Sequence, residues 1–214
     1  TAADGNKDQT YYLFGIDRDA LRKTLFPLGD MTKDEVRAVA EEHGIVTAQK
    51  PESMEICFVT SGDYRDVVRA RGGAGRPGRF VDVNGGMLGV HDGVDGFTIG
   101  QRRGLPALGA PHYVAAIDAE GGDVTLVPRD GLERMTMFVS GVRWLIDAPA
   151  DGEPVQGELK VRARHRPVSG SITATGASAK VVFEEPVNAI TPGQAAVFYR
   201  GSQVLGGGWI DGSA

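Results

Sequence analysis

The stretch AAVFYRGSQVLGGGWI, residues 195–210, indicates most clearly what kind of fold this chain adopts. It holds two short apolar runs, 195–199 and 203–210, separated by a polar turn that contains a glycine. Runs of this length and composition, bounded by turn residues, are typical of β-strands. The glycines at 206–208 are not followed by the Lys-Ser or Lys-Thr of a phosphate-binding loop, so we interpret them as glycines that pack inside a strand.

Similar short runs recur toward the N-terminus, and turn residues stand between them. Two of the turns, Asn84-Gly85 and Glu120-Gly121-Gly122, have the composition of β-hairpin turns. Many short strands at close spacing are typical of a small closed barrel or a sandwich. The further predicted strands are 79–83, 86–90, 112–117, 123–127, 141–146, 155–165, 171–175 and 180–184.

The first sixty residues have a different, α/β character. Thr32 is followed three residues later by Glu35, which is the capping-box pattern of a helix start, and Gly44 supplies a stop. The sequence therefore predicts a helix between them, and it predicts a second helix over 63–71. Residues 25–29 are predicted to form a strand or an extended link.

Composition limits the class of protein. With 41% hydrophobic residues, 24% charged residues and a net charge of −5, the chain fits a globular protein and not a nonspecific nucleic-acid coat protein. No apolar run approaches the ~20 residues that cross a bilayer, and a single cysteine cannot form an internal disulfide. We therefore expect a cytoplasmic protein without a membrane partner. The chain begins at Thr1 within polar sequence, and for this reason we expect a fragment.

Cations gather in one segment of this acidic chain. Residues 159–180 carry five cations and no carboxylate. In the run Lys160–Arg166, strict alternation would place four cations on one face of a strand. Their spacing would be roughly 6.6 Å, which can follow a phosphate backbone. An outer strand face whose charges only contact water and prevent edge pairing is an equally good interpretation.

Two further features concern possible binding sites. The segment Phe97–Leu105 joins a short strand to a basic turn between glycines. This turn either contacts nucleic acid or another domain, or it is a plain turn with two solvated arginines. The four histidines stand alone, without CxxC or HxxxH spacing, so we predict that this chain binds no metal.

Cys57 is the only cysteine, and its local sequence leaves two interpretations open. A thiolate that performs chemistry needs a nearby cation, helix N-terminus or metal, and the neighbouring Glu52 and Glu55 disfavour it. Free cysteine is also among the most buried residue types. Local sequence therefore favours a buried apolar residue, with sulfur chemistry as the alternative.

Eight segments spread over almost the whole chain carry a further signal. They are KDQTYYLF (7–14), LFPLGDMTKDEVRAVAEEHGI (25–45), KPESMEICFV (50–59), FTIGQRRGL (97–105), PHYV (111–114), VRARHRP (161–167), TPGQAAVFY (191–199) and LGGGWI (205–210). In this order they resemble the bacterial tRNA-specific 2-thiouridylase family, sulfurtransferases that act on the wobble uridine (position 34) of tRNA.

The resemblance implies an α+β, mostly β chain with three parts. Residues 1–60 would be the end of a catalytic α/β domain with a persulfide-cysteine loop, 61–132 a central β-rich domain, and 133–214 a C-terminal β-barrel that binds tRNA. ATP would be bound by an N-terminal pyrophosphatase domain that this chain lacks, so the fragment alone would be inactive.

The resemblance also implies a reaction, its partners and its site residues. ATP adenylates the C2 oxygen of the uridine, and sulfur from a cysteine persulfide replaces that oxygen to give 2-thiouridine. Besides tRNA, the partner would be a persulfide sulfur donor or relay protein. Cys57 corresponds to the second catalytic cysteine, which carries the persulfide and can pass through a disulfide. The implied tRNA-contacting residues are Lys7, Asp8, Gln9, Arg162, Ala163 and Gln194.

Two other classes of function remain as alternatives. The first is a noncatalytic RNA-binding module whose barrel recognises structured RNA by its shape and phosphates. The second is a β-domain for protein interaction whose arginines are incidental.

Overall fold

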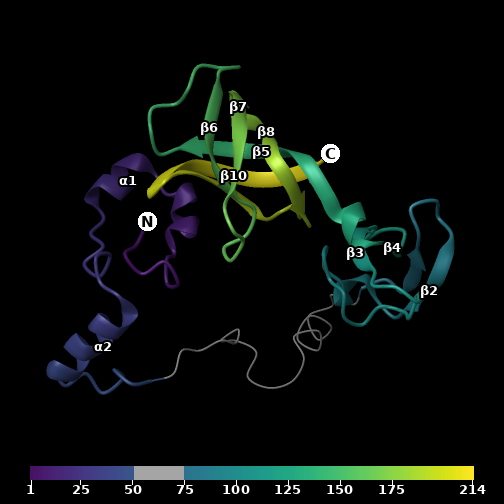
Figure 1. Cartoon of the computed structure of the whole chain (residues 1–214), viewed down its shortest axis with the longest axis horizontal. Coiled ribbons are helices and arrows are strands. Elements are labelled where there is room, and N and C mark those ends of the chain that lie inside the picture. The colour runs from purple at the N-terminus through teal and green to yellow at the C-terminus, as the bar shows by residue number, and fades with distance from the viewer. Residues whose placement is uncertain (51–74) are drawn as a thin grey trace. The chain divides into compact units, whose positions relative to one another are not determined.

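The computed structural model describes residues 1–50 and 75–214. Cys57 and the helix predicted over 63–71 lie outside the described residues. The fold is α+β and mostly β, with a closed barrel and a separate small sheet (Figure 1). None of the helices that the structure describes is long and apolar enough to cross a membrane. Of the described residues, unit 1 contains 1–50, 134–186 and 190–214, and unit 2 contains 75–133 and 187–189.

Three helical elements open unit 1: η1 (Thr10–Gly15), α1 (Arg18–Lys23) and α2 (Lys33–Glu42). Helix α2 confirms the prediction from the capping box. The Thr32 side chain accepts a hydrogen bond from the Glu35 backbone N at 3.4 Å, and the Glu35 carboxylate accepts one from Thr32 N at 2.7 Å. Gly44 follows with φ of 66°, the left-handed conformation that ends many helices. Residues 25–29 form a link that contains a turn, not a strand.

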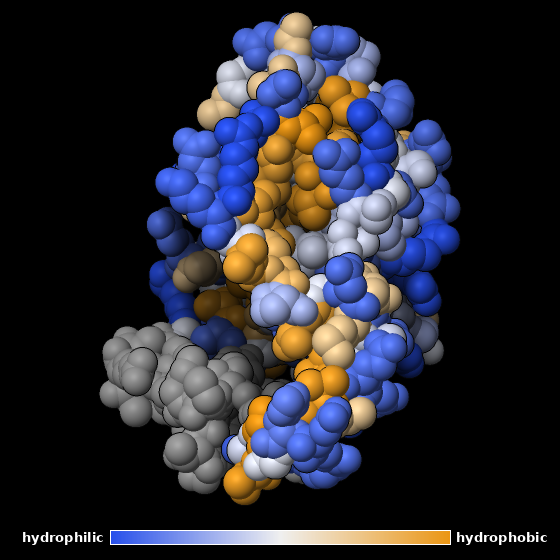
Figure 2. Space-filling view, turned by 90° about the vertical axis from the view of Figure 1, so that its left-hand side faces the viewer, coloured by the Kyte–Doolittle hydropathy of each residue, from blue (hydrophilic) through white to orange (hydrophobic). Residues whose placement is uncertain are grey.

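The segment around α1 and α2 exposes apolar side chains. No residue of either helix is buried. Figure 2, which views this side of the molecule, shows hydrophobic residues at the surface among hydrophilic ones. Leu25, Phe26, Leu28, Ile45 and Val46 are among the exposed ones. Within the described residues, α1 and α2 therefore have no core of their own, whereas η1 packs on the barrel as described below.

Unit 2 is built on a four-stranded sheet with the order β2-β1-β4-β3. The two hairpins, β1–β2 and β3–β4, are antiparallel, and β1 pairs with β4 in parallel. Both predicted hairpin turns are confirmed, with Gly85 and Gly122 at φ of 82° and 86°. The core of the sheet includes Phe80, Val114 and Val124. The elements are β1 (Gly78–Val81), β2 (Met87–His91), η2 (Val94–Gly96), β3 (Tyr113–Ile117), β4 (Asp123–Val127) and η3 (Arg129–Leu132).

The predicted alternative of barrel or sandwich resolves to a barrel, closed in the order β10-β5-β8-β7-β6-β9. Strands β7 and β8 alternate buried and exposed residues over much of their length, as barrel strands do. Leu159, Ile172, Phe183 and Phe198 are among the fully buried side chains. The strands are β5 (Glu133–Trp144), β6 (Pro154–Lys160), β7 (Val168–Thr175), β8 (Ser178–Asn188), β9 (Ala195–Arg200) and β10 (Gln203–Ser213).

The three glycines 206–208 of β10 are packing glycines, as the sequence predicted. A Cβ atom on Gly206 would lie 2.2 Å from the Arg143 carbonyl oxygen. One on Gly208 would lie 2.5 Å from the Ser140 carbonyl oxygen. Both distances are shorter than any real contact, so only glycine lets β10 approach β5 this closely.

The predicted basic strand Lys160–Arg166 is wrong. Strand β6 ends at Lys160, and 161–167 form the connection to β7, which we call the β6–β7 loop. The reason lies in the hairpin register: Leu159 pairs with Val168, so the residues between them must reverse the chain. Alternation of polar and apolar residues does not distinguish such a loop from a strand.

Candidate functional site

Strand β9 is buried on both of its faces. Ala196 and Phe198 are fully buried, and the Phe198 ring lies 5.7 Å from the Trp144 ring between centroids. The alternate residues pack instead against Tyr11 and Phe14 of η1. Helix η1 therefore covers the outer face of β9. We call the buried set Tyr11, Phe14, Ala195, Val197 and Tyr199 the η1–β9 cluster.

Specific contacts hold η1 on the barrel. The Tyr11 hydroxyl donates a buried hydrogen bond of 2.7 Å to the Ala195 carbonyl oxygen. Burial raises the pKa of Tyr11 to about 12, so the hydroxyl keeps its proton and remains a donor. The Phe14 ring meets Trp209 edge-on at 5.4 Å, and a Cβ on Gly207 would lie 2.9 Å from the Phe14 Cβ. The segment that precedes and includes η1 is thus fixed to β9 and β10.

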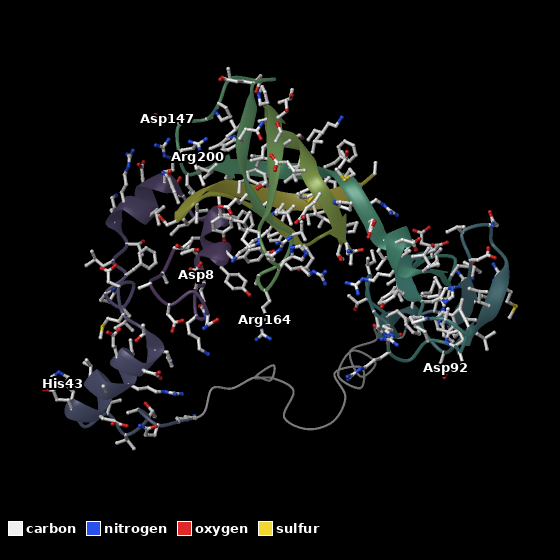
Figure 3. The ribbon with its side chains drawn as sticks, viewed as in Figure 1. Asp8, His43, Asp92, Asp147, Arg164 and Arg200 are labelled. Atoms are coloured by element: carbon white, nitrogen blue, oxygen red, sulfur yellow. The ribbon has the colours of Figure 1, made fainter. Side chains whose placement is uncertain are left out.

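Asp8 orders the loop just before η1. Its carboxylate accepts hydrogen bonds from Thr10 N at 3.0 Å, Thr10 Oγ1 at 2.9 Å and Ala2 N at 3.3 Å. Partial burial acts to raise the pKa of Asp8, but these hydrogen bonds outweigh burial and lower it. Lys7 and Gln9 on either side are exposed. Asp8, labelled in Figure 3, therefore shapes the loop from which Lys7 and Gln9 extend.

The start of the β6–β7 loop reaches the same cluster. Ala163 is half-buried and packs against the η1–β9 cluster. Arg162 lies close enough to Tyr11 to oppose, electrostatically, part of the rise in the Tyr11 pKa. Lys160 places its Nζ 5.4 Å from the centre of the Tyr199 ring, within the range of a cation–π contact. Lys160, at the end of β6, and Arg162, in the β6–β7 loop, therefore lie beside Tyr11 and Tyr199 of the η1–β9 cluster.

The second half of the loop carries two arginines in different situations. Arg166 forms an ion pair with Glu185 of β8. Arg164 is exposed and forms neither a hydrogen bond nor an ion pair within the part of the chain that the structure describes. Figure 3 shows it projecting from the loop. Between them, burial lowers the pKa of His165, and the positive charges of Arg162 and Arg166 act in the same direction.

Gln194 lies next to the η1–β9 cluster because it directly precedes Ala195, the first residue of β9. Its backbone N closes a turn onto Thr191 O at 3.2 Å, and its carbonyl accepts from Ile210 N at 2.8 Å. The side chain is exposed, and the next residue, Ala195, is the one that binds the Tyr11 hydroxyl. Gln194 is thus adjacent to Ala195, whose carbonyl oxygen binds the Tyr11 hydroxyl of η1.

The structure brings the described site residues that the sequence predicted to one cluster. Lys7, Asp8 and Gln9 precede η1, and Gln194 directly precedes Ala195, which binds the Tyr11 hydroxyl. Ala163 packs against the η1–β9 cluster, and Arg162 lies close enough to Tyr11 to affect its pKa. Arg164 was predicted only as one cation of the basic run Lys160–Arg166, and Tyr11 and Tyr199 were not singled out. No local pattern links Tyr11 to a strand 184 residues away. Cys57 lies outside the described residues.

This arrangement offers the groups that bind sugar and phosphate oxygens. Exposed cationic and amide side chains are the usual donors to a nucleic-acid backbone. Here they are held on a rigid barrel by apolar packing. Among the residues that the structure describes, no group of three or more His, Cys, Asp or Glu side chains could hold a metal ion.

Family models match the chain in three consecutive stretches. Residues 1–61 match a tRNA methyl transferase HUP domain. Residues 65–128 match a tRNA methyl transferase PRC-barrel domain, and 134–210 match an aminomethyltransferase β-barrel domain.

Curated relatives match the chain over nearly its whole length. A tRNA-specific 2-thiouridylase of Maricaulis maris is 46% identical over 215 residues, which cover 98% of this chain and 53% of the relative. Proteins of the same name from Carboxydothermus hydrogenoformans and Geotalea uraniireducens are each 44% identical over 97% of this chain. The matches cover 58% and 56% of those two relatives. The chain therefore spans a little over half the length of the curated relatives it matches.

Proposed function

Because the chain belongs to the tRNA-specific 2-thiouridylase family, we propose that it forms part of an enzyme that converts the wobble uridine of tRNA to 2-thiouridine. The observation that carries this proposal is the similarity of 44–46% over nearly the whole chain to relatives of that name. The whole reaction is proposed for the full-length protein.

In the proposed reaction ATP transfers its adenylyl group to the C2 oxygen of the uracil ring, and pyrophosphate leaves. The terminal sulfur of a persulfide on Cys57 then forms a bond to C2. A second thiol attacks the Cys57 sulfur, a disulfide forms, and the electron pair of the broken S–S bond passes to the sulfur on C2. AMP departs with the former C2 oxygen, and cellular thiols reduce the disulfide. Cys57 is the only cysteine of this chain, so the second thiol comes from outside these 214 residues.

We assign ATP binding to no described residue. The run of glycines at 206–208, which is the most glycine-rich stretch of the barrel, packs inside β10 against neighbouring backbone. The contribution that we assign to the described residues is to bind and orient tRNA.

We further propose that the exposed and half-buried polar groups around the η1–β9 cluster contact the tRNA. Arg162 and Arg164 would bind phosphate, and their unpaired state within the described chain supports this. The neutral amide of Gln194 would donate a hydrogen bond to phosphate or sugar. Lys7 and Gln9 would contact the tRNA from the loop that precedes η1. Asp8 carries a negative charge that tRNA phosphates would repel, so we assign it the shaping of this loop. Ala163 would pack against the η1–β9 cluster, and its backbone groups would contact the tRNA.

The sulfur chemistry is tested in a strain whose full-length protein carries Cys57→Ser. We expect bulk tRNA from this strain to lack 2-thiouridine by mass spectrometry, while the variant protein accumulates normally and still binds tRNA. Normal 2-thiouridine in this strain would exclude the sulfur-carrier role. Retained modification in a deletion strain, together with tRNA binding by the purified protein, would favour the noncatalytic RNA-binding module.

The RNA-binding face is tested by measuring tRNA affinity of the full-length protein against salt. Arg162→Ala and Arg164→Ala should each weaken binding of different tRNAs by a similar factor and lower the salt slope by roughly one unit. Gln194→Ala should weaken binding with little change of slope, because the amide is neutral.

The matched control is Lys180→Ala. Lys180 belongs to the same cation-rich segment, 159–180, but pairs with Thr173, five residues along β7 from Val168, which directly follows the β6–β7 loop. That separation is roughly 17 Å at ~3.3 Å per residue. If Lys180→Ala changes the slope as much as Arg164→Ala does, binding follows overall charge and the proposed face is refuted.

A further inference from the structure

In unit 2, a glutamine side chain holds the basic loop 97–104 in one shape. The Gln101 Oε1 accepts from Thr98 N at 3.1 Å, and its Nε2 donates to Gly96 O at 3.3 Å and to Arg103 O at 2.9 Å. The backbone adds two bonds to β3, Gly100 N to Val114 O at 2.8 Å and Val114 N to Gln101 O at 3.0 Å. The Gln101 side chain therefore connects the two ends of the loop, and the two backbone hydrogen bonds attach the loop to β3.

The loop also depends on two glycines in the left-handed conformation. Gly100 and Gly104 have φ of 84° and 76°, which other residues rarely adopt. A Cβ on Gly100 would lie 2.7 Å from the Ala189 Cβ. The sequence Gly-Gln-Arg-Arg-Gly therefore specifies a preformed loop, in contrast to a plain flexible turn.

This preformed loop presents two uncompensated cations. Arg102 and Arg103 are exposed, and neither guanidinium group forms a hydrogen bond or ion pair with any residue that the structure describes. By contrast, Arg79 of the same unit pairs with Asp123, with an N···O distance of 2.6 Å. Carboxylates outnumber cations over 75–133, so this unit carries a net negative charge. Two adjacent arginines left unpaired in an acidic unit suit an anionic ligand.

A hollow adjoins the loop. Its volume is about 440 Å³, within the range of small-ligand pockets, and Arg102 forms part of its wall. Leu105, Leu108 and Pro111 give it apolar walls, and His112 adds a ring. The His112 Nδ1 donates to Ala110 O at 2.9 Å, because a carbonyl oxygen can only accept. Nε2 forms no hydrogen bond within the part of the chain that the structure describes.

We propose that the loop 97–104 and this hollow form a second RNA contact, which we call the Arg102–His112 site. Arg102 and Arg103 bind backbone phosphate, and the hollow takes an unstacked base. The proposal rests on the proposed function and adds a site on unit 2 to the barrel face. Arginine forks match phosphate oxygens, and unstacked RNA bases pack on apolar, histidine or guanidinium surfaces. The combination of two adjacent arginines and a hollow with apolar walls fits a nucleotide better than an acidic peptide, which would use only the charges.

The charge half of the proposal is tested by tRNA affinity of the full-length protein against salt. Arg102→Ala and Arg103→Ala should each lower the salt slope by roughly one unit. The matched control is Arg129→Ala, an exposed arginine of η3 in the same unit but outside the loop, which should leave the slope unchanged. Gln101→Ala keeps both charges but releases the loop, so affinity should fall with a smaller change of slope. Equal slopes for wild type, Arg102→Ala and Arg103→Ala would overturn the proposal.

The hollow is tested by crosslinking. A photoreactive benzophenone amino acid at Leu108 should crosslink to tRNA, and the same group at the exposed Val83 should not. A crosslink from Leu108 to protein in place of tRNA would overturn the proposal in favour of a peptide partner. Failure of the wild type to bind any tRNA would refute the proposed function itself. Binding of tRNA that is unchanged in Arg102→Ala would refute only the Arg102–His112 site.

Discussion

Removal of the Tyr11 hydroxyl should loosen the attachment of η1 without unfolding the barrel. In Tyr11→Phe, the Ala195 carbonyl oxygen loses the buried donor that lies 2.7 Å away. Leaving a buried acceptor without its partner costs about 1–3 kcal/mol. This is less than the total stability of an ordinary domain, about 5–15 kcal/mol, so the protein should remain folded.

The same loss should change the local opening of η1 strongly. At about 1.36 kcal/mol per factor of ten, it raises the undocked population about 5- to 160-fold. The assay is amide hydrogen exchange, which reports such local opening. The amides of Tyr12 and Ile16, which bond Gln9 O and Leu13 O, should exchange faster by that factor.

Tyr12→Phe provides the matched control, because the Tyr12 side chain is 66% exposed and loses only a solvated hydroxyl. Its exchange rates in η1 should equal those of the wild type, and amides of β7 should be unaffected in both variants. Unchanged exchange of Tyr12 and Ile16 in Tyr11→Phe would refute the idea that this hydrogen bond holds the segment on the barrel.

Three further results are expected. In Gly207→Ala the new Cβ lies 2.5 Å from the Ala196 carbonyl oxygen, so denaturant unfolding should show a loss of about 1–3 kcal/mol, whereas Gly212→Ala, which meets no atom within 4 Å, should be nearly neutral. The folded-state pKa of Asp8 is lowered, so its carboxylate stabilises the fold above about pH 4 and this contribution is lost as the pH falls through the folded-state pKa. Asp8→Asn should therefore make acid unfolding, followed by circular dichroism, less steep, and an identical acid transition would contradict this. The folded-state pKa of His165 is also lowered, so stability declines as the pH falls from about 6.5 through that pKa, and His165→Gln should flatten the melting temperature between about pH 7 and 5.

A fold of short strands, either a barrel or a sandwich, could be predicted from the sequence because its signals are local. Period-two burial in β7 and β8 of the barrel acts over a few residues, and so does the glycine turn Asn84-Gly85 of the unit 2 sheet. The capping box of α2 is local in the same way. The end of β6 could not be predicted, because the pairing of Leu159 with Val168 sets it and the alternation simply continues past it.

The candidate site was only partly predictable for a related reason. The run AAVFY of β9 is apolar without alternation, which is a sign of burial on both faces, but it does not say what covers the second face. That cover is η1, and the contact between Tyr11 and Ala195 spans almost the whole chain. Lys7, Gln9, Arg162 and Gln194 were identified through the family resemblance, whereas their common location depends on this long-range packing.

The apolar packing of η1 affects how the proposed RNA binding by this face can be measured. Buried rings and the Tyr11 hydrogen bond hold η1, and the hydrogen bonds of Asp8 shape the loop of Lys7 and Gln9. Salt screens exposed charges over about 10 Å at 0.1 M but leaves apolar burial intact or strengthens it. Raising the salt concentration should therefore weaken the contacts of Arg162 and Arg164 with phosphate while η1 stays in place. Because buried apolar contacts hold η1 on the barrel, we expect the slope of affinity against salt to report the proposed phosphate contacts and to be comparable between variants.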